Sequence, residues 1–528
     1  MAIVIFWEMH LSKLTTIGLV LFLAGRVAAQ EPVDLRYTIS MEEPGAHRYH
    51  VVFRCAGLSG PVVDLKMPVW MPGYYQLLDY ARKVEHFRAV DAEGRELRWE
   101  KTTDNTWRVA TAAVEGGRAP SVRAVVTVSY DVAATKAFVA QPWLDSTRGY
   151  IAPAGVFLYV DGYLRRPVTV EVRPWKGWSK VATGLEPVGA ERMGVEKKYV
   201  FRAEDFDILY DSPILMGNLE ELPSFTVGKV PHYFTGYQLG DFDRAAFVES
   251  LKKVVEQGVA VIGDIPYKHY TFLAIGPGRG GIEHLNSTTI GFSGEGLKNA
   301  EGRQQLLCFI AHEYFHHYNV KRIRPMALGP FDYERENRTN SLWVSEGLTV
   351  YYEYMLVRRA GLMSGEDLLH HFQSDIIAYE TKPGHLYQSL AQSSYETWSD
   401  GPFGRTGDSV NKTISYYQKG PAVGLLLDMA IRHSTKNRKS LDDVMRRLYR
   451  VYYQEKKRGF TDAEVRQVCE EVAGEALPEI FDYVYTVKEP DYAKYLGYGG
   501  LGIDKDFSLY PLSQVDALQE EIRKDWMK

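Results

Sequence analysis

Two histidines and a glutamate at fixed spacing carry the clearest chemistry in this sequence of 528 residues. His312, Glu313 and His316 follow the pattern His-Glu-x-x-His. On a helix, residues i and i+4 lie on one face, with their Cβ atoms about 5–6 Å apart. Two imidazoles at that spacing can bind one Zn²⁺ ion, and the glutamate between them can accept a proton from a water molecule that the metal activates. The motif therefore predicts a catalytic zinc site.

A site of this kind needs a third protein ligand, and the sequence offers Glu346. This glutamate lies 30 residues after His316, near the start of a helix predicted over residues 342–352. His312, His316 and Glu346 are thus the predicted ligands of one zinc ion per chain. Cys308, one turn before His312, is interpreted as core packing rather than as a ligand.

The elements that must position this site are predicted on both sides of the motif. The motif itself lies in a helix predicted over residues 303–322 and stopped by Pro325. Before it, a predicted strand at residues 270–275 leads into a glycine-rich turn and then Glu283. No Gly-Lys-Ser/Thr follows the turn, so a phosphate loop is not expected.

Gly280 and Gly281, at the end of that turn, are predicted to let the backbone approach a ligand closely.

The first part of the chain has the pattern of a β domain. Runs of β-branched and aromatic residues at 48–53, 124–130 and 168–172 have strand length. Glycines and prolines separate them, which is typical of a β-sandwich. A stiff, exposed loop is expected at residues 67–74, either as a turn packed on the next domain or as a wall of the substrate site. Residues 30–212 are assigned to this domain.

Helical patterns follow. One helix is predicted over residues 243–257, stopped by Gly258, and another over residues 421–432. Ser364, Ser440 and Thr461 each begin a predicted capping box. The domain assignment is residues 213–435 for a catalytic domain and 436–528 for a C-terminal helical region.

Composition limits the possible partners and the compartment. The net charge is −5 with no basic run, so nucleic acid is not an expected partner. Three widely spaced cysteines cannot form a disulfide framework and are expected to be buried thiols. Lys13 precedes an apolar run at residues 14–24, and small residues follow before Gln30. This predicts a signal peptide over residues 1–29, with translation starting at Met1 or Met9, and an exported, periplasmic or extracellular protein without stable membrane insertion.

Several segments together resemble the glycyl aminopeptidase family of gluzincin metallopeptidases. The resemblance rests on residues 67–73, 280–284, 312–316, 319–322, 343–347 and 416–420, in that order. It implies an N-terminal β-sandwich-like domain followed by a thermolysin-like catalytic domain, and hence a multidomain α+β fold. Many members carry a C-terminal PDZ domain, but the residues after 499 are too few for one.

The resemblance also implies further site residues and an activity. Glu283, with Gly280 and Gly281, would bind the free amine of a peptide substrate, and the Tyr417 hydroxyl would face the oxyanion. The expected activity is removal of amino-terminal residues, preferably Gly or Ala, from peptides. Two alternatives stay open: an endopeptidase with the same zinc chemistry, and a non-catalytic peptide-binding protein with a vestigial metal site. The oligomeric state is not predicted.

Overall fold

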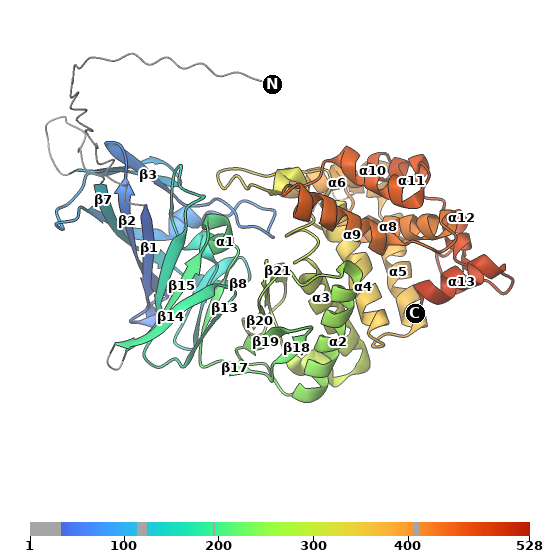
Figure 1. Cartoon of the computed structure of the whole chain (residues 1–528), viewed down its shortest axis with the longest axis horizontal. Coiled ribbons are helices and arrows are strands. Elements are labelled where there is room, and N and C mark those ends of the chain that lie inside the picture. Colours follow the sequence, from blue (N-terminus) through green and yellow to red (C-terminus); the bar gives the residue numbers. More distant parts are fainter. Residues whose placement is uncertain (1–32, 113–123, 194–195, 405–410) are drawn as a thin grey trace, which may run out of the picture. The chain divides into compact units, whose positions relative to one another are not determined.

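Strands dominate the first part of the chain and helices the second (Figure 1). The computed structural model describes residues 33–112, 124–193, 196–404 and 411–528. The predicted signal segment, residues 1–29, lies outside the described residues. A β-rich N-terminal domain, a catalytic region and a helical C-terminal part follow one another, which confirms the predicted multidomain α+β fold.

The largest sheet of the N-terminal domain contains all three predicted strands. In spatial order its described strands are β14 (Glu186–Met193), β15 (Glu196–Ala203), β12 (Val168–Arg173), β1 (Asp34–Ser40), β2 (Arg48–Leu58), β7 (Ala124–Ala133) and β4 (Val84–Val90). Burial alternates along β7, as expected for a strand with one face in a core.

Two smaller sheets complete this domain. One contains β13 (Lys180–Thr183), β16 (Ile214–Gly217), β10 (Arg148–Ile151), β9 (Gln141–Leu144) and β8 (Thr135–Phe138); the other contains β11 (Tyr159–Val160), β3 (Val62–Lys66), β6 (Thr106–Ala110) and β5 (Trp99–Thr103). Phe53 of the large sheet, Leu65 of the third and Leu215 of the second belong to one buried cluster, so the layers share a core. Since β16 pairs with β10, the β domain extends to Gly217.

A separate mixed sheet supports the catalytic region. It contains β17 (Glu220–Glu221), β19 (Val230–Gly236), β20 (Tyr270–Ala274), β22 (Ser287–Ile290) and β21 (Gly281–Glu283), with β18 (Phe225–Val227) paired to β19. β20 is the strand predicted at 270–275. In the described part of the chain β21 lies at the edge of this sheet and pairs only with β22, antiparallel.

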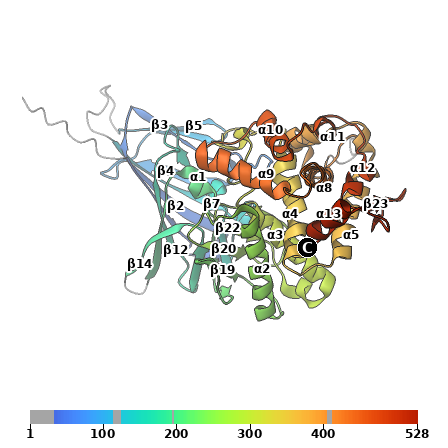
Figure 2. The same ribbon diagram turned by 45° about the vertical axis from the view of Figure 1, so that its right-hand side comes forward.

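Helices pack on this sheet and against one another. α3 (Ala300–Phe315) contacts β21 and β22 as well as α4 (Leu348–Arg359), an arrangement visible in Figures 1 and 2. The other helices are α1 (Phe206–Tyr210), α2 (Arg244–Ile262), α5 (Gly365–Glu380), α6 (Leu390–Tyr395), α7 (Thr397–Asp400), α8 (Tyr416–Ser434), α9 (Leu441–Leu448), α10 (Asp462–Ala473), α11 (Pro478–Tyr485), α12 (Tyr492–Tyr498) and α13 (Ala517–Trp526). A two-stranded sheet, β23 (Leu501–Ile503) with β24 (Leu509–Pro511), precedes α13.

Short sequence patterns correctly predict where three of the helices begin. Ser364, Ser440 and Thr461 form the predicted capping boxes of α5, α9 and α10. Cys55, Cys308 and Cys469 are buried free thiols, as expected.

Three predicted helix boundaries are wrong. α3 ends at Phe315 and not near residue 322, because the backbone turns at His316, whose ring bonds a carbonyl three residues later. α2 continues through Gly258 to Ile262, since Gly258 packs against the Tyr314 ring, where a Cβ would lie only 2.8 Å from Cε1. α8 starts at Tyr416, so Pro421 lies inside the helix rather than at its start.

The loop at residues 67–74 is not the exposed loop that the sequence suggested. Met67, Trp70 and Met71 are fully buried. The Trp70 indole donates a hydrogen bond to the Asp332 carbonyl (2.8 Å) and packs edge-on against Trp398 at 5.1 Å between ring centroids. The loop therefore packs the β domain against the second, helical part of the chain.

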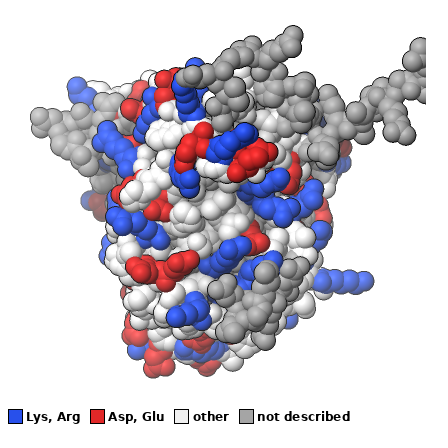
Figure 3. Space-filling model, turned by 90° about the vertical axis from the view of Figure 1, so that its left-hand side faces the viewer, with Lys and Arg blue, Asp and Glu red and all other residues white. Residues whose placement is uncertain are grey.

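On the molecular face shown in Figure 3, basic and acidic side chains are interspersed, without a broad area of one sign. Among the described residues, no helix is long and apolar enough to cross a membrane.

Candidate zinc site

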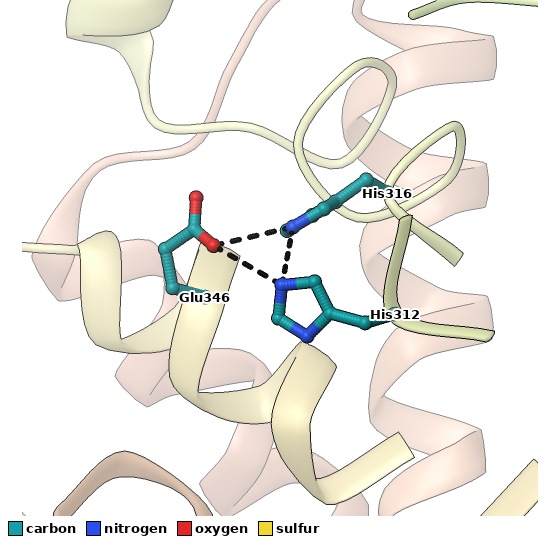
Figure 4. Close-up of side chains that lie close together, drawn as sticks. All are labelled: His312, His316 and Glu346. Atoms are coloured by element: carbon teal, nitrogen blue, oxygen red, sulfur yellow. Dashed lines mark hydrogen bonds and ion pairs between the residues drawn. The ribbon is translucent and has the colours of Figure 1, made fainter. Parts of the chain in front are cut away.

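The three predicted metal ligands converge on one point (Figure 4). His312 and His316 come from the last turn and the C-terminal cap of α3, and Glu346 comes from a π-helical turn, Trp343–Gly347, that leads into α4. The two Nε2 atoms are 2.9 Å apart, and Glu346 Oε2 lies 3.5 Å from His312 Nε2 and 3.2 Å from His316 Nε2.

These separations suit a single zinc ion. Ligand atoms about 2.0–2.1 Å from a tetrahedral metal lie about 3.3 Å from one another, and the three observed distances bracket that value. The set of two imidazoles and one carboxylate is a common donor set of catalytic zinc, which leaves one coordination position open. Burial raises the pKa of the Glu346 carboxyl, but the two histidines outweigh this and lower it, so the ligand is ionised.

Hydrogen bonds behind the ligands fix both histidine rings. His312 Nδ1 donates to Glu353 Oε2 (2.7 Å) on α4, and His316 Nδ1 donates to the Asn319 carbonyl (2.7 Å). Each ring therefore keeps its proton on Nδ1 and presents an Nε2 lone pair to the metal point. Such outer partners typically change metal affinity about 10–100-fold when removed.

Asn319 links the two halves of the ligand set. Its amide donates to the Val344 carbonyl (2.7 Å) in the turn that carries Glu346, while its own carbonyl holds His316. It also donates to Thr349 Oγ1 (3.0 Å) at the start of α4. The early end of α3 thus places Asn319 where it can tie both ligand segments together.

Glu313 is buried against the glycine-rich segment. A Cβ built on Gly281 would lie 2.4 Å from Glu313 Cδ, so any other residue at that position would displace the Glu313 side chain. The segment thus approaches Glu313 closely, while the predicted close approach to a ligand stays a prediction. Burial raises the pKa of the Glu313 carboxyl to about 7, although the neighbouring histidines oppose the rise. A carboxylate in this position is suited to accept a proton near neutral pH.

Tyr417 reaches the site from the first turn of α8. Its hydroxyl donates to Glu346 Oε2 (2.8 Å), the same oxygen that faces the histidines. This contact requires the π-helical turn that ends at Gly347 to lie very close to α8, because a Cβ added to Gly347 would be 2.6 Å from Gly420 Cα. Burial first, and then the Glu346 charge, raise the Tyr417 pKa well above its usual value, so the hydroxyl remains a proton donor.

Glu283, at the end of edge strand β21, is buried beside this site. Its Oε1 atom has no hydrogen-bond partner among the described residues, and the nearest cation is Lys321, at 3.7 Å from Nζ. Lys321 itself donates to Asp211 Oδ1 at 2.7 Å. The β-domain loop comes close as well, since a Cβ on Gly73 would lie 2.8 Å from Glu283 Oε2. A Cβ added to Gly280, one residue before β21, would have Val139 as its nearest described neighbour beyond the adjoining residues, at 3.6 Å, and would meet neither the Glu283 nor the Glu313 carboxylate.

The sequence reasoning missed three residues around this site. Glu353 follows Glu346 by seven residues, two helical turns, and that spacing could have indicated it. Tyr75 follows directly on the loop that was singled out; after burial, the charges of Glu346 and Glu283 raise its pKa well above the usual value. Lys321 belongs to a segment used for the family resemblance, but no local pattern shows that its ammonium turns inward.

Comparison with known proteins agrees with this geometry. Residues 36–218 match the description Peptidase M61 N-terminal domain, and residues 305–423 match M61 glycyl aminopeptidase. The two matches cover more than half of the chain in the order seen in the structure. A search of curated proteins gave no significant match.

Solved structures share the fold. An aminopeptidase N family protein from Idiomarina loihiensis is 25% identical over 89% of this chain and 79% of its own, with a TM-score of 0.80. An M1 zinc metallopeptidase from Deinococcus radiodurans is 14% identical over 87% of this chain and 96% of its own, with a TM-score of 0.52. A mutant form of that metallopeptidase has a Tyr-Ser-Ala substrate bound.

The fold and the site together define a zinc metallopeptidase. Within that class, the chain belongs to the M61 glycyl aminopeptidase family.

Proposed function

We propose that this peptidase is an aminopeptidase that removes small residues, Gly or Ala, from the free amino termini of peptides. The observation that carries the proposal is Glu283, a buried carboxylate with one oxygen left without a hydrogen bond, on a sheet edge beside the predicted zinc ligands. A buried charge of this kind is costly unless a counter-charge meets it, and the ammonium group of a substrate would supply one.

The edge strand favours an extended substrate. β21 pairs only with β22 among the described strands, so its outer edge can hydrogen-bond a peptide backbone. A peptide whose ammonium group is held by Glu283 would then present its first peptide bond to Glu313 and the metal ligands. This is the geometric basis for cleavage one residue from the amino end.

His312, His316 and Glu346 would hold the zinc ion, which supplies Lewis-acid chemistry and lowers the pKa of water towards about 7. Glu313 accepts the proton of the attacking water and delivers it to the leaving amine. The Tyr417 hydroxyl, kept protonated, moves its hydrogen bond from Glu346 to the oxygen of the scissile carbonyl as negative charge develops on that oxygen.

The preference for a small first residue has support from the β domain. A Cβ added to Gly73 would lie 2.8 Å from Glu283 Oε2, and the charge of Glu283 acts on the buried Tyr75; these close neighbours favour a small side chain beside the ammonium group. The description of the matched family, glycyl aminopeptidase, agrees with this preference.

The test compares Ala- and Gly-peptides that have a free amine with the same peptides after acetylation, each with and without a chelator. We expect hydrolysis of the free peptides only, abolished by the chelator. Glu283→Gln should raise KM and lower kcat/KM for free peptides, while the exposed Glu475→Gln serves as a matched control. Equal cleavage of free and acetylated peptides would instead establish the endopeptidase, and no hydrolysis by the zinc-loaded protein would establish the binding protein.

We also propose that the protein is exported, on the basis of Lys13, the apolar run at residues 14–24 and the small residues before Gln30. Amino-terminal sequencing of protein from outside the cytoplasm should begin at Gln30. A cytoplasmic protein that begins at Met1 or Met9 would contradict export.

A further inference from the structure

A cavity of about 320 Å³ lies where the β domain, the segment after α3 and the C-terminal helical region meet. Its wall includes six basic side chains: Arg165, Lys321, Arg322, Arg324, Lys457 and Arg458. None of the predicted zinc ligands lines it, nor do Glu283 and Glu313. The cavity is therefore distinct from the metal site, although Lys321 lies between the two, on the cavity wall and 3.7 Å from Glu283.

The acidic side chains of this wall already form ion pairs with two of its basic side chains, Arg165 and Lys321. Arg165 Nη1 bonds Asp207 Oδ2 at 2.8 Å and approaches Asp205 at 3.4 Å. Asp211 accepts hydrogen bonds from the Lys321 ammonium (2.7 Å) and from the Leu285 amide (2.8 Å).

Arg458 also has its counter-charge, because it forms two hydrogen bonds with Glu464, at 2.6 and 2.9 Å. Three cations of the wall remain, Arg322, Arg324 and Lys457, and none of them forms an ion pair within 4 Å among the described residues.

Arg322 is the most deeply buried of these three, with 5% of its surface exposed. Its two terminal nitrogens donate to backbone carbonyls, including those of Leu285 (2.9 Å) and Pro266 (3.0 Å), which carry no net charge. Its Nε atom is buried and has no hydrogen-bond partner in the described structure. A buried guanidinium with an unused donor is costly unless a ligand meets it.

Arg324 and Lys457 complete the set. The Arg324 guanidinium is half-buried and lies 5.9 Å from the centre of the Phe331 ring; among described residues it forms no side-chain hydrogen bond or ion pair. Lys457 lies 5.6 Å from the Tyr453 ring centre and has no carboxylate within 4 Å in the described part of the chain. Burial lowers the pKa of Arg324, and the charges of Asp207 and Asp211 only partly oppose this fall.

We propose that this cavity binds a small oxyanion with two or more negative charges, the chemistry of a phosphate or sulfate group. Guanidinium groups match the geometry of such oxyanions, and a cavity of this volume can enclose one. Arg322 supplies its free Nε–H, and Arg324 and Lys457 supply the remaining donors and charge. Because Arg322 and Arg324 come from the segment after α3 and Lys457 comes from the C-terminal helical region, the bound anion links these two parts of the wall.

The test is calorimetric titration of the zinc-loaded protein with sodium sulfate and, in a parallel arm, sodium phosphate, at constant ionic strength maintained with sodium chloride. We expect saturable binding of one anion per chain and a rise in the thermal midpoint with anion concentration, since a ligand that binds only the folded state stabilises it. Arg324→Gln and Lys457→Gln should each weaken the affinity about tenfold, the loss expected for one charge-assisted hydrogen bond. Lys456→Gln, a neighbouring lysine outside the cavity wall, should bind as the wild type does.

Oxyanions can also ligate zinc, so the titration is repeated with Glu346→Gln, which alters the metal site and leaves the cavity intact. Binding should persist in that variant. The proposal is overturned if neither anion binds the wild type saturably, if Glu346→Gln removes the binding, or if Arg324→Gln leaves the affinity unchanged. None of these results depends on whether the protein cleaves peptides.

Discussion

Glu353 holds His312 in place: its Oε2 atom accepts the proton on His312 Nδ1 at 2.7 Å, and this turns Nε2 towards Glu346. The pair joins the first helix of the site, α3, to the second, α4. His312 is buried and Glu353 is half-buried, so the hydrogen bond is largely shielded from water.

Removal of this partner should weaken zinc binding. Glu353→Ala is expected to lower zinc affinity about 10–100-fold, measured by competition with a chelator of known affinity. Glu353→Gln keeps an acceptor and should lose less. If both variants bind zinc as tightly as the wild type, His312 does not need this hydrogen bond to act as a ligand.

Gly281→Ala tests the contact between the glycine segment and Glu313. The new methyl group would lie 2.4 Å from Glu313 Cδ, which forces the carboxylate to move. We expect a fall in kcat of at least about 10²-fold with zinc still bound, since misplacement of a catalytic group by about 1 Å can cost that much.

Gly278→Ala is the matched control, because the nearest atom to its added Cβ is 4.0 Å away. Should both variants keep wild-type turnover, Glu313 would not need its observed position for catalysis.

Tyr417→Phe removes one hydroxyl that faces the metal point. A fall in kcat of about 10²–10³-fold with a small change in KM is expected for loss of an oxyanion donor. Tyr416→Phe is the control, because that hydroxyl bonds Thr397 instead (2.9 Å). Turnover within a few-fold of the wild type would exclude the oxyanion role. A parallel loss of zinc affinity would show that the hydroxyl supports the ligand Glu346 instead.

Lys419 predicts a pH dependence of stability. Its ammonium is buried without a hydrogen-bond partner in the described structure, and burial lowers its pKa from 10.5 to about 8. Since the folded pKa lies below the unfolded one, the unfolded chain holds this proton up to higher pH. The contribution of Lys419 to the free energy of unfolding should thus be unfavourable below about pH 8 and improve up to about pH 10.5.

Lys419→Met should therefore stabilise the protein near pH 7 by about 2–3 kcal/mol, and this gain should shrink as the pH rises to about 10.5. Denaturant unfolding at several pH values measures the difference between the two proteins. Lys505→Met, at an exposed site, should show no such trend. A constant difference across the range would mean that Lys419 titrates normally.

Local patterns in the sequence predicted the parts of the fold that depend on neighbouring residues. The capping boxes at Ser364, Ser440 and Thr461 occur as predicted. Each one satisfies backbone N–H groups at the start of a helix through hydrogen bonds among four consecutive residues. The structure also brings His312, His316 and Glu346 together. Helical spacing alone places the two histidines side by side.

Features that depend on tertiary contact could not be predicted in this way. Gly258 fails to end α2 because the Tyr314 ring occupies the space beside it. The position of Asn319 after α3 depends on its hydrogen bond to the Val344 carbonyl, 25 residues away in the chain. The inward turn of Lys321 depends on Asp211, 110 residues away in the chain.

The most direct test of the account is a zinc titration of the metal-free protein, with hydrolysis of a free Ala-peptide as the readout. Three protein ligands at one point predict that activity rises in proportion to added zinc and stops rising at one zinc ion per chain. Glu346→Gln, with its weakened ligand, should regain little activity over the same range. Full activity in the metal-free protein, or an endpoint other than one zinc ion per chain, would contradict the account.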